Sequence, residues 1–354
     1  MAATESSRLL TLDGMRGLAA IAVVLSHLDF VGPLAPSGYL AVDFFFVMSG
    51  VVIARAYQGK FERGLPFGNF LAERFIRLYP LYFVGLLIGI AHRIGQIGAH
   101  NPHQMSWSDL GASAIFNLML LPSPMTEELG PLNGPSWSLF LELLVNVIWA
   151  AALVKMSTRK LIVYVLFTGL ALCFAILAKG SANFGFAWLD VHIGIARSFF
   201  GFGLGVVLAR YFGQRRPRSS TLSLLPALAL CVVLVTNITP KFRALYDLVA
   251  IFICFPAIVW AGVTFDPTRT LRSAAHALGD MSYPVYIMHL APLYTLGFFA
   301  RKFNWSPLLW IPLFILGICA LSLLLSRTFD PFARRLLSAI EARRRMRSVK
   351  LLVG

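Results

Sequence analysis

Long apolar segments alternate with short polar loops along the whole chain. A helix that crosses a bilayer needs about 20 mostly apolar residues, so this pattern predicts an all-α fold, a polytopic membrane helix bundle with about ten transmembrane helices. The expected spans are residues 14–31, 38–57, 75–95, 136–155, 160–178, 192–210, 222–239, 246–264, 282–300 and 306–326. Residues 111–122 are apolar but too short to cross, and we expect them to form a re-entrant or interfacial segment.

The distribution of basic residues predicts the topology. With the N-terminus placed inside and the sides alternated, 24 of the 31 lysines and arginines fall on the inner side. Cytoplasmic loops carry such an excess, so both termini are expected in the cytoplasm. Residues 1–330 then form the membrane domain, and residues 331–354 form a basic amphipathic cytoplasmic tail. We expect this tail to rest on anionic lipid headgroups rather than to form a dedicated partner site.

Composition supports an integral membrane protein and weakens the case for other classes. Hydrophobic residues make up 58% of the chain and charged residues 13%, whereas soluble proteins carry about 25% charged residues. The net charge of +15 resides in short loops between apolar segments, so it reflects topology and no nucleic-acid partner is expected. The four cysteines lie in apolar segments without CxxC spacing, so no metal site is expected.

A polar stripe runs along the first expected span. Arg16 and His27 are eleven residues apart, which brings them to within about 20° of the same direction on a helix. Asp13 precedes Arg16 by three residues and shares that side. Ionisable groups within a bilayer are costly and usually line a cavity or site, so we favour a functional role for this stripe. The alternative is a histidine that only hydrogen-bonds a neighbouring helix.

A second polar face lies on the span 136–155. Ser138 and Glu142 are four residues apart, and Glu142 lies about 9 Å below the outer surface, close to the depth of His27. A lone buried carboxylate is costly, so Glu142 is expected to pair with His27, an arrangement that general-base chemistry uses. Asp43 is the second candidate for orienting His27, and an interfacial carboxylate is its alternative interpretation.

Two arginines mark the cytoplasmic edge of the span 75–95. Arg74 and Arg77 are three residues apart and share one helical face. Positive-inside topology alone could explain them. Together with Arg16 they could equally bind phosphates, because a guanidinium matches phosphate oxygens bidentately.

The span 282–300 opens with polar residues at helical spacing. Tyr286 and His289 follow Ser282 at i+4 and i+7, so the three share a face. We expect Tyr286 and His289, with Ser138, to line the same substrate cavity as His27. The alternative, that His289 merely satisfies a neighbouring backbone group, stays open.

Five short segments together resemble the acyltransferase 3 family of membrane O-acyltransferases. They are LDGMRGLAAIAVVLSH, VDFFFVMSG, RFIRLYP, WSLFLE and SYPVYIMH, and they occur in the family's order. The resemblance implies transfer of an acyl group, with acetyl as the default, from cytoplasmic acyl-CoA to a hydroxyl of a glycan or other cell-surface acceptor. It also implies a location in the bacterial inner membrane, with acyl-CoA as donor substrate and no further cofactor.

The resemblance also assigns roles to residues. His27 falls on the family's essential histidine and Arg16 on its paired arginine, while Glu142 falls on the family's glutamate and Arg74 and Arg77 on its basic motif. Some relatives carry a fused extracytoplasmic esterase-like domain. This chain is expected to act alone or with a separate extracytoplasmic partner.

These observations suggest one mechanism and two rivals. Arg74, Arg77 and Arg16 would hold the phosphates of acyl-CoA, and its pantetheine arm would lie along the stripe of Asp13, Arg16 and His27. His27 would act as general base or as a transient acyl carrier. A secondary transporter could instead use intramembrane His, Glu and Arg for proton relay or anion binding, although no internal repeat is evident. A membrane scaffold whose polar residues only hold helices together is the third interpretation. Turnover of acetyl-CoA distinguishes the enzyme from both rivals.

Overall fold

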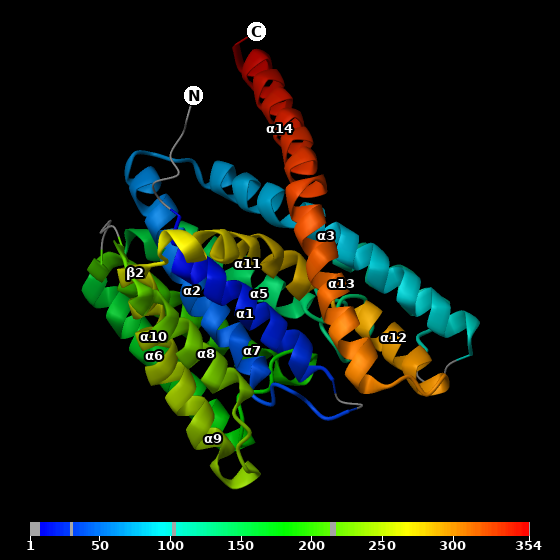
Figure 1. Ribbon diagram of the computed structural model, residues 1–354. Helices are drawn as coiled ribbons and strands as arrows, with labels where there is room; N and C mark the ends of the chain where they lie inside the picture. The colour runs from blue at the N-terminus through cyan, green and yellow to red at the C-terminus, as the bar shows by residue number, and fades with distance from the viewer. Residues whose placement is uncertain (1–7, 29–30, 101–103, 213–216, 354) are drawn as a thin grey trace.

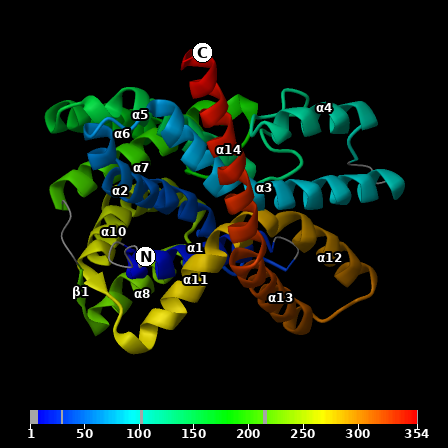
Figure 2. The same ribbon diagram turned by 90° about the horizontal axis from the view of Figure 1, so that it is seen from above.

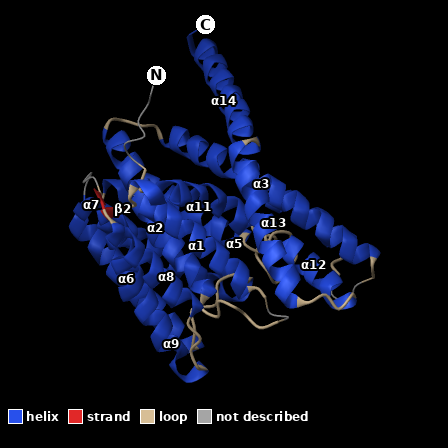
Figure 3. Cartoon of the chain, in the orientation of Figure 1, coloured by secondary structure: helices blue, strands red, loops and turns tan. Residues whose placement is uncertain are grey.

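The computed structural model describes residues 8–28, 31–100, 104–212 and 217–353, with side chains described up to residue 343. The described chain confirms the all-α prediction (Figure 3). Its strands are two residues long, β1 (Arg218–Ser219) and β2 (Phe265–Asp266), and they pair in parallel. The helical tail α14 (Phe329–Val353) projects away from the bundle on the side where α1 (Leu10–Ser26) begins (Figure 1).

The remaining helices follow in chain order. They are α2 (Ala41–Glu62), α3 (Phe67–Gly98), α4 (Trp107–Leu118), α5 (Ser136–Ala151), α6 (Thr158–Lys179), α7 (Val191–Phe212), α8 (Leu224–Val235), α9 (Pro240–Val249), α10 (Phe255–Thr264), α11 (Arg269–Met288), α12 (Leu290–Lys302) and α13 (Pro307–Arg327). Short 3₁₀ helices are η2 (Gly38–Leu40), η3 (Leu153–Lys155), η4 (Trp188–Asp190) and η5 (Thr221–Ser223), and a π-helical segment η6 (Ala250–Cys254) joins α9 to α10.

Several helices have the length and composition of membrane spans. Within the described ranges, six helical segments are long and apolar enough to cross a bilayer: Gly38–Glu62, Phe67–Gly98, Thr158–Lys179, Trp188–Phe212, Pro240–Thr264 and Pro307–Arg343. The shorter segments Ser136–Ala151 and Thr221–Val235 are also apolar. The expected span 14–31 overlaps α1, which has 17 residues and begins and ends earlier than expected. The expected span 282–300 overlaps the end of α11 and most of α12, which are separated by a break. The protein is therefore an integral membrane protein with several apolar helices.

Glycines allow two pairs of helices to pack backbone against backbone. A Cβ on Gly50 of α2 would collide with the backbone of Phe202 in α7, and one on Gly205 of α7 would collide with the backbone of α2. Gly17 of α1 makes the same kind of approach to Leu278 of α11. Small residues permit such close packing in membrane bundles, where helix association depends on van der Waals contact. These contacts fix α1 on α11 and α2 on α7, the two helix pairs that hold most of the polar residues described below.

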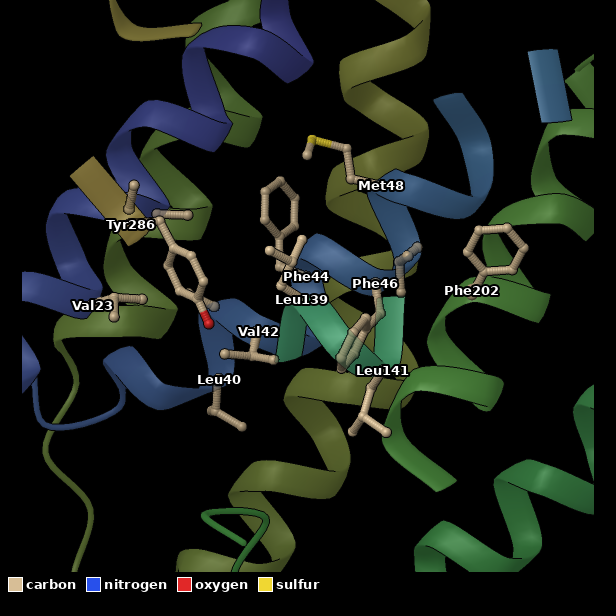
Figure 4. Close-up of a cluster of buried hydrophobic side chains, with 14 of the residues drawn as sticks. Val23, Leu40, Val42, Phe44, Phe46, Met48, Leu139, Leu141, Phe202 and Tyr286 are labelled. Atoms are coloured by element: carbon tan, nitrogen blue, oxygen red, sulfur yellow. The ribbon is translucent and has the colours of Figure 1, made fainter. Parts of the chain in front are cut away.

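Side chains from several helices interlock beside these contacts. Figure 4 shows Val23, Val42, Phe46, Leu139, Phe202 and Tyr286 among a buried cluster that joins α1, α2, α5, α7 and α11. Seen from above, α4, α12 and α13 lie apart from the group of α2, α5, α6 and α7 (Figure 2), whereas α3 contacts α5 and extends toward α4. The short helix α4 coincides with the apolar segment 111–122 that the sequence identified as too short to cross.

The break between α11 and α12 departs from the expected continuous span 282–300. His289 stands between the two helices and is fully buried. Pro292 follows three residues later; a proline has no N–H to donate, and its ring clashes with the carbonyl four residues before it. The proline therefore accounts for the end of α11 at Met288. The helix α3 also begins earlier than expected, so Arg74 and Arg77 both lie within it.

The expected boundary at residue 330 and the lipid contact of the tail stay predictions. α14 starts at Phe329, one residue before that boundary. Several of the tail's basic residues lie beyond residue 343, outside the described side chains.

Candidate active site

A cavity of about 750 Å³ opens beside the end of α1. Side chains from several helices line it, among them Tyr39 of η2, Trp137 of α5, Arg197 of α7 and Tyr286 of α11, together with His27, which follows α1. Its volume falls within the range of about 300–1,000 Å³ that is typical of small-molecule sites. By the predicted topology this end of α1 faces the extracytoplasmic side.

His27 stands at the end of α1 with its ring folded back onto the helix. Its Nδ1 lies 2.7 Å from the carbonyl oxygen of Val23, one turn earlier. A carbonyl only accepts hydrogen bonds, so Nδ1 carries the proton and donates a hydrogen bond to the carbonyl oxygen of Val23. In the neutral ring, Nε2 then holds the lone pair. The backbone of α1 thus sets the tautomer that a general base requires, and the side chain reaches the cavity wall.

A second histidine contacts the first. The Nε2 of His289 lies 3.5 Å from the Nδ1 of His27, and the ring centroids are 5.2 Å apart. The Nδ1 of His289 lies 2.8 Å from the carbonyl oxygen of Tyr286 and donates to it. Of the two alternatives that the sequence left open, the contacts favour the second, because His289 satisfies a backbone carbonyl of α11 and is not among the described residues that line the cavity. It also contacts His27. It approaches from the protein interior rather than from the cavity.

Tyr286 joins the cavity wall to α5. Its hydroxyl lies 2.6 Å from the hydroxyl of Ser138, and Figure 4 shows its ring among the packed side chains near Val23 and Val42. Of the residues expected to line the cavity with His27, Tyr286 does so, whereas Ser138 and His289 lie behind the wall and contact Tyr286 and His27. Their roles in binding substrate stay predictions.

Glu142 takes partners that differ from the expected one. It accepts hydrogen bonds from Arg74, at 2.9 Å, and from the hydroxyl of Ser49, also at 2.9 Å. Within the described residues it makes no hydrogen bond to His27, so the expected Glu142–His27 pair is not found. The physical reason is that a guanidinium is permanently charged and compensates a carboxylate better than an imidazole does. Arg74 is buried, and Glu142 is its charge partner.

Asp43 also pairs with an arginine instead of orienting His27. Its two oxygens accept hydrogen bonds from Nε and Nη2 of Arg197, at 2.9 Å and 2.7 Å. The side chains are 2% and 1% exposed, so Asp43 is not an interfacial carboxylate either. Sequence reasoning missed Arg197 as a partner. Its signal was present, because an arginine in an apolar span needs a buried counter-charge.

Asp13 and Arg16, which the sequence places on one side of the helix, form an ion pair near the start of α1. Arg16 lies 2.9 Å from Asp13 and also donates to the hydroxyl of Ser282 at 2.7 Å. Arg8 binds Asp13 from the opposite side and reaches Asp280 of α11 at 2.8 Å. These contacts hold the guanidinium of Arg16 in one orientation against α11.

Arg77 lies near Arg16 and Arg74. It is exposed on α3, and its charge is close enough to act on both Arg16 and Arg74. Glu142 also acts on Arg16. The three arginines that the sequence proposed for phosphate binding therefore lie in one region, on the side of the bundle where α1 begins.

Comparison with known proteins gives the chain its family. The family model described as an acyltransferase domain, that of acyltransferase 3, matches residues 9–327. Protein 2 in the picA locus of Rhizobium radiobacter is 40% identical over 162 residues, which are 42% of this chain and 85% of that protein. No solved structure matches the chain.

Two longer matches carry a named activity. The peptidoglycan O-acetyltransferase OatA of Listeria monocytogenes is 26% identical over 318 residues, and the putative peptidoglycan O-acetyltransferase YrhL of Bacillus subtilis is 25% identical over 345 residues. They cover 81% and 88% of this chain, whereas the chain spans about half the length of each, 49% and 52%. Because the family match extends over nearly all the described bundle, the chain belongs to the acyltransferase 3 family of membrane acyltransferases.

Proposed function

We propose that the protein moves an acyl group, with acetyl as the default, from cytoplasmic acyl-CoA to a hydroxyl of a cell-surface glycan. In this proposal the membrane domain, residues 1–330, crosses the bacterial inner membrane ten times and keeps both termini in the cytoplasm. The similarity to two peptidoglycan O-acetyltransferases supports a glycan acceptor. The start of α1 and the tail α14 lie on the same side of the bundle, which is compatible with an even number of crossings (Figure 1).

One observation carries the proposal: His27 faces a cavity of about 750 Å³ at one end of α1, and a cluster of arginines surrounds the other end. Eleven residues separate Arg16 from His27, which is a rise of about 16 Å along the helix. A substrate held at the arginines would therefore extend along α1 to present its reactive end to the histidine. Such a two-sided site suits a donor from one side of the membrane and an acceptor from the other.

The arginines suit the anionic end of the donor. Arg74 is held by Glu142, and Arg16 is held by Asp13 and Ser282, so both guanidinium groups are fixed before substrate binds. Guanidinium groups bind phosphates through paired hydrogen bonds, and acyl-CoA carries several phosphates. Preorganised groups of this kind lose little side-chain entropy on binding.

The transfer step then follows from the tautomer of His27. Its Nε2 takes the proton of the acceptor hydroxyl while the hydroxyl oxygen attacks the thioester carbonyl. The carbon–sulfur bond breaks, and the CoA thiolate leaves with the proton that the imidazolium returns, which gives an ester and CoA. A general base contributes about 10² to 10⁴ to the rate. Val23 keeps the donating nitrogen turned away from the acceptor throughout.

The test is turnover of acetyl-CoA by purified protein in detergent, with and without a sugar acceptor. His27→Ala should lower the rate at least about a hundredfold. The exposed His192 of α7 offers a matched control, and His192→Ala should keep the parent rate. Wild-type protein that leaves acetyl-CoA intact would instead support a transporter or a scaffold. Intact-protein mass spectrometry after acetyl-CoA alone would show whether an acyl group resides on His27.

A further inference from the structure

Three arginines line the cavity, although the predicted topology places it on the outer side of the membrane, where basic residues are few. The predicted topology places seven lysines and arginines on the outer side, and three of them, Arg93, Arg197 and Arg243, line this one cavity. Outer loops are normally poor in such residues. Their convergence on the cavity that His27 faces therefore points to a role in binding.

Two of the three arginines have no carboxylate within ion-pair distance among the described residues. Arg197 is neutralised by Asp43. Arg93 instead donates to the carbonyl of Pro131, at 3.1 Å and 2.9 Å, and to the side-chain oxygen of Gln96 at 2.9 Å. These neutral acceptors fix the guanidinium at the wall but leave its charge uncompensated.

Arg243 is held in a similar way at another part of the wall. It donates to the hydroxyl of Ser37 at 2.7 Å. Asp247 acts on it electrostatically but is fully buried, and its oxygens already accept hydrogen bonds from Tyr39 and from the backbone of Ala182. Tyr39 lies between the two, within 3.5 Å of the guanidinium. Arg243 therefore lines the cavity, whereas Asp247 lies behind the wall and accepts hydrogen bonds from Tyr39 and Ala182.

The other polar and aromatic groups of the wall fit the same kind of ligand. Glu128 is the one acidic side chain among the described residues that line the cavity, so cations outnumber anions there. Trp137 and Tyr39 add aromatic faces, which are common in pockets that hold small molecules. A sugar could pack on these rings while an attached anion meets the arginines.

We infer that the acceptor is anionic: a hydroxyl-bearing glycan that carries a carboxylate or phosphate group, bound by Arg93 and Arg243 while His27 takes its hydroxyl proton. Arginine suits both anions because its fork of donors matches their oxygens. The inference rests on the proposed acyl transfer and adds the acceptor's charge to it. Arg93 and Arg243 are thereby assigned as acceptor-binding residues of the extracytoplasmic side.

The first test identifies the natural acceptor without assuming one. The gene is deleted in the bacterium that carries it, and all envelope glycans are compared by mass spectrometry for lost O-acyl groups. The inference requires that the affected sugars contain, or directly adjoin, a carboxylate or a phosphate, and the fragment masses distinguish these two sources. Loss of acyl groups from a wholly neutral glycan would overturn the inference while leaving the proposed acyl transfer intact. No loss from any glycan would count against both.

The second test uses matched acceptors with the full-length protein in detergent and acetyl-CoA as donor. The acceptors are methyl glucoside, methyl glucuronoside and methyl glucoside 6-phosphate. Wild type should show a kcat/KM at least about tenfold higher for a charged acceptor than for the neutral one, because a charge-assisted hydrogen bond typically contributes that much. Equal or lower values for both charged acceptors would overturn the inference.

Variants assign the effect to the two arginines. Arg93→Gln and Arg243→Gln should each lower kcat/KM for the preferred charged acceptor about tenfold and affect the neutral acceptor much less. Lys241→Gln removes an exposed outer cation beside Arg243 that does not line the cavity, and it should retain the preference. Where a glutamine variant fails to fold, the corresponding lysine variant keeps the charge and should retain part of the preference. Equal losses for charged and neutral acceptors would refute the assignment.

Discussion

The buried pair between Asp43 and Arg197 gives a sharp test of whether Asp43 is structural or catalytic. Both side chains are almost completely buried, at 2% and 1% exposed, and two hydrogen bonds of 2.9 Å and 2.7 Å join them. Asp43→Leu would leave the Arg197 charge without its paired carboxylate, with hydrogen bonds to the carbonyl oxygens of Phe184 and Tyr39 and the ring of Trp137 beside it. Breaking a buried pair by removing one partner typically costs about 3–5 kcal/mol, so we expect a loss of at least about 3 kcal/mol in unfolding free energy.

A double-mutant cycle isolates the pair from other effects of each substitution. Arg197→Met should cost a similar amount, because it leaves the carboxylate of Asp43 buried and unpaired. The double variant replaces the pair by apolar side chains, a change that is often nearly neutral, so it should recover most of the loss. We therefore expect a coupling energy of at least about 2 kcal/mol. The measurement is reversible unfolding in mixed detergent micelles.

Glu127→Gln is the matched control for the loss of a carboxylate. Glu127 is exposed, and its substitution should change the unfolding free energy by no more than about 0.5 kcal/mol. Acetyl-CoA turnover is measured on the same samples and expressed per folded molecule. An Asp43→Leu protein that unfolds like the parent but has lost its turnover would refute the structural assignment and restore a role for Asp43 beside His27.

Two further substitutions test the packing of the bundle and the support of the donor site. Gly205→Ala places a methyl group against the backbone of α2 and should cost about 1–3 kcal/mol in unfolding free energy. The control Gly317→Ala places its methyl group in open space and should cause no loss of unfolding free energy. Equal effects of the two substitutions would contradict the proposed packing. Ser282→Ala removes a hydrogen bond to Arg16 worth about 1 kcal/mol, so the KM for acetyl-CoA should rise about fivefold. Ser326→Ala, which removes a hydroxyl bonded only to its own helix, should leave that KM unchanged, and an unchanged KM in Ser282→Ala would exclude the supporting role.

Features that depend on a single segment could be predicted from the sequence. Apolar length and loop charge predicted an all-α membrane protein, because both are local properties of the chain. The spacing of Asp13 and Arg16 within one helix predicted that they share one side, and the two form an ion pair there. The break at His289 was also accessible in principle, since Pro292 follows three residues later, but the apolar character of residues 282–300 concealed it.

Partners on different helices could not be predicted in the same way. Matching depth suggested that Glu142 and His27 meet, but depth along the membrane normal leaves the rotation of each helix about its axis undetermined. That rotation depends on which faces pack, and here Gly50 and Gly205 fix α2 on α7 by close backbone contact. Glu142 consequently meets Arg74 rather than His27. The same limitation applies to Arg93 and Arg243, because the sequence does not show that these two residues line one cavity.

The charges around the cavity connect the proposed reaction with the inferred acceptor. When His27 takes a proton it becomes an imidazolium at a wall that already holds Arg93 and Arg243. Like charges within a site of low dielectric constant repel strongly, so this state is costly if the cavity contains only neutral ligand. An acceptor anion bound at the two arginines compensates their charge and lowers that cost at the moment of proton transfer. An anionic acceptor would therefore accelerate the chemical step as well as bind more tightly, and its advantage over a neutral acceptor should be visible in kcat as well as in KM.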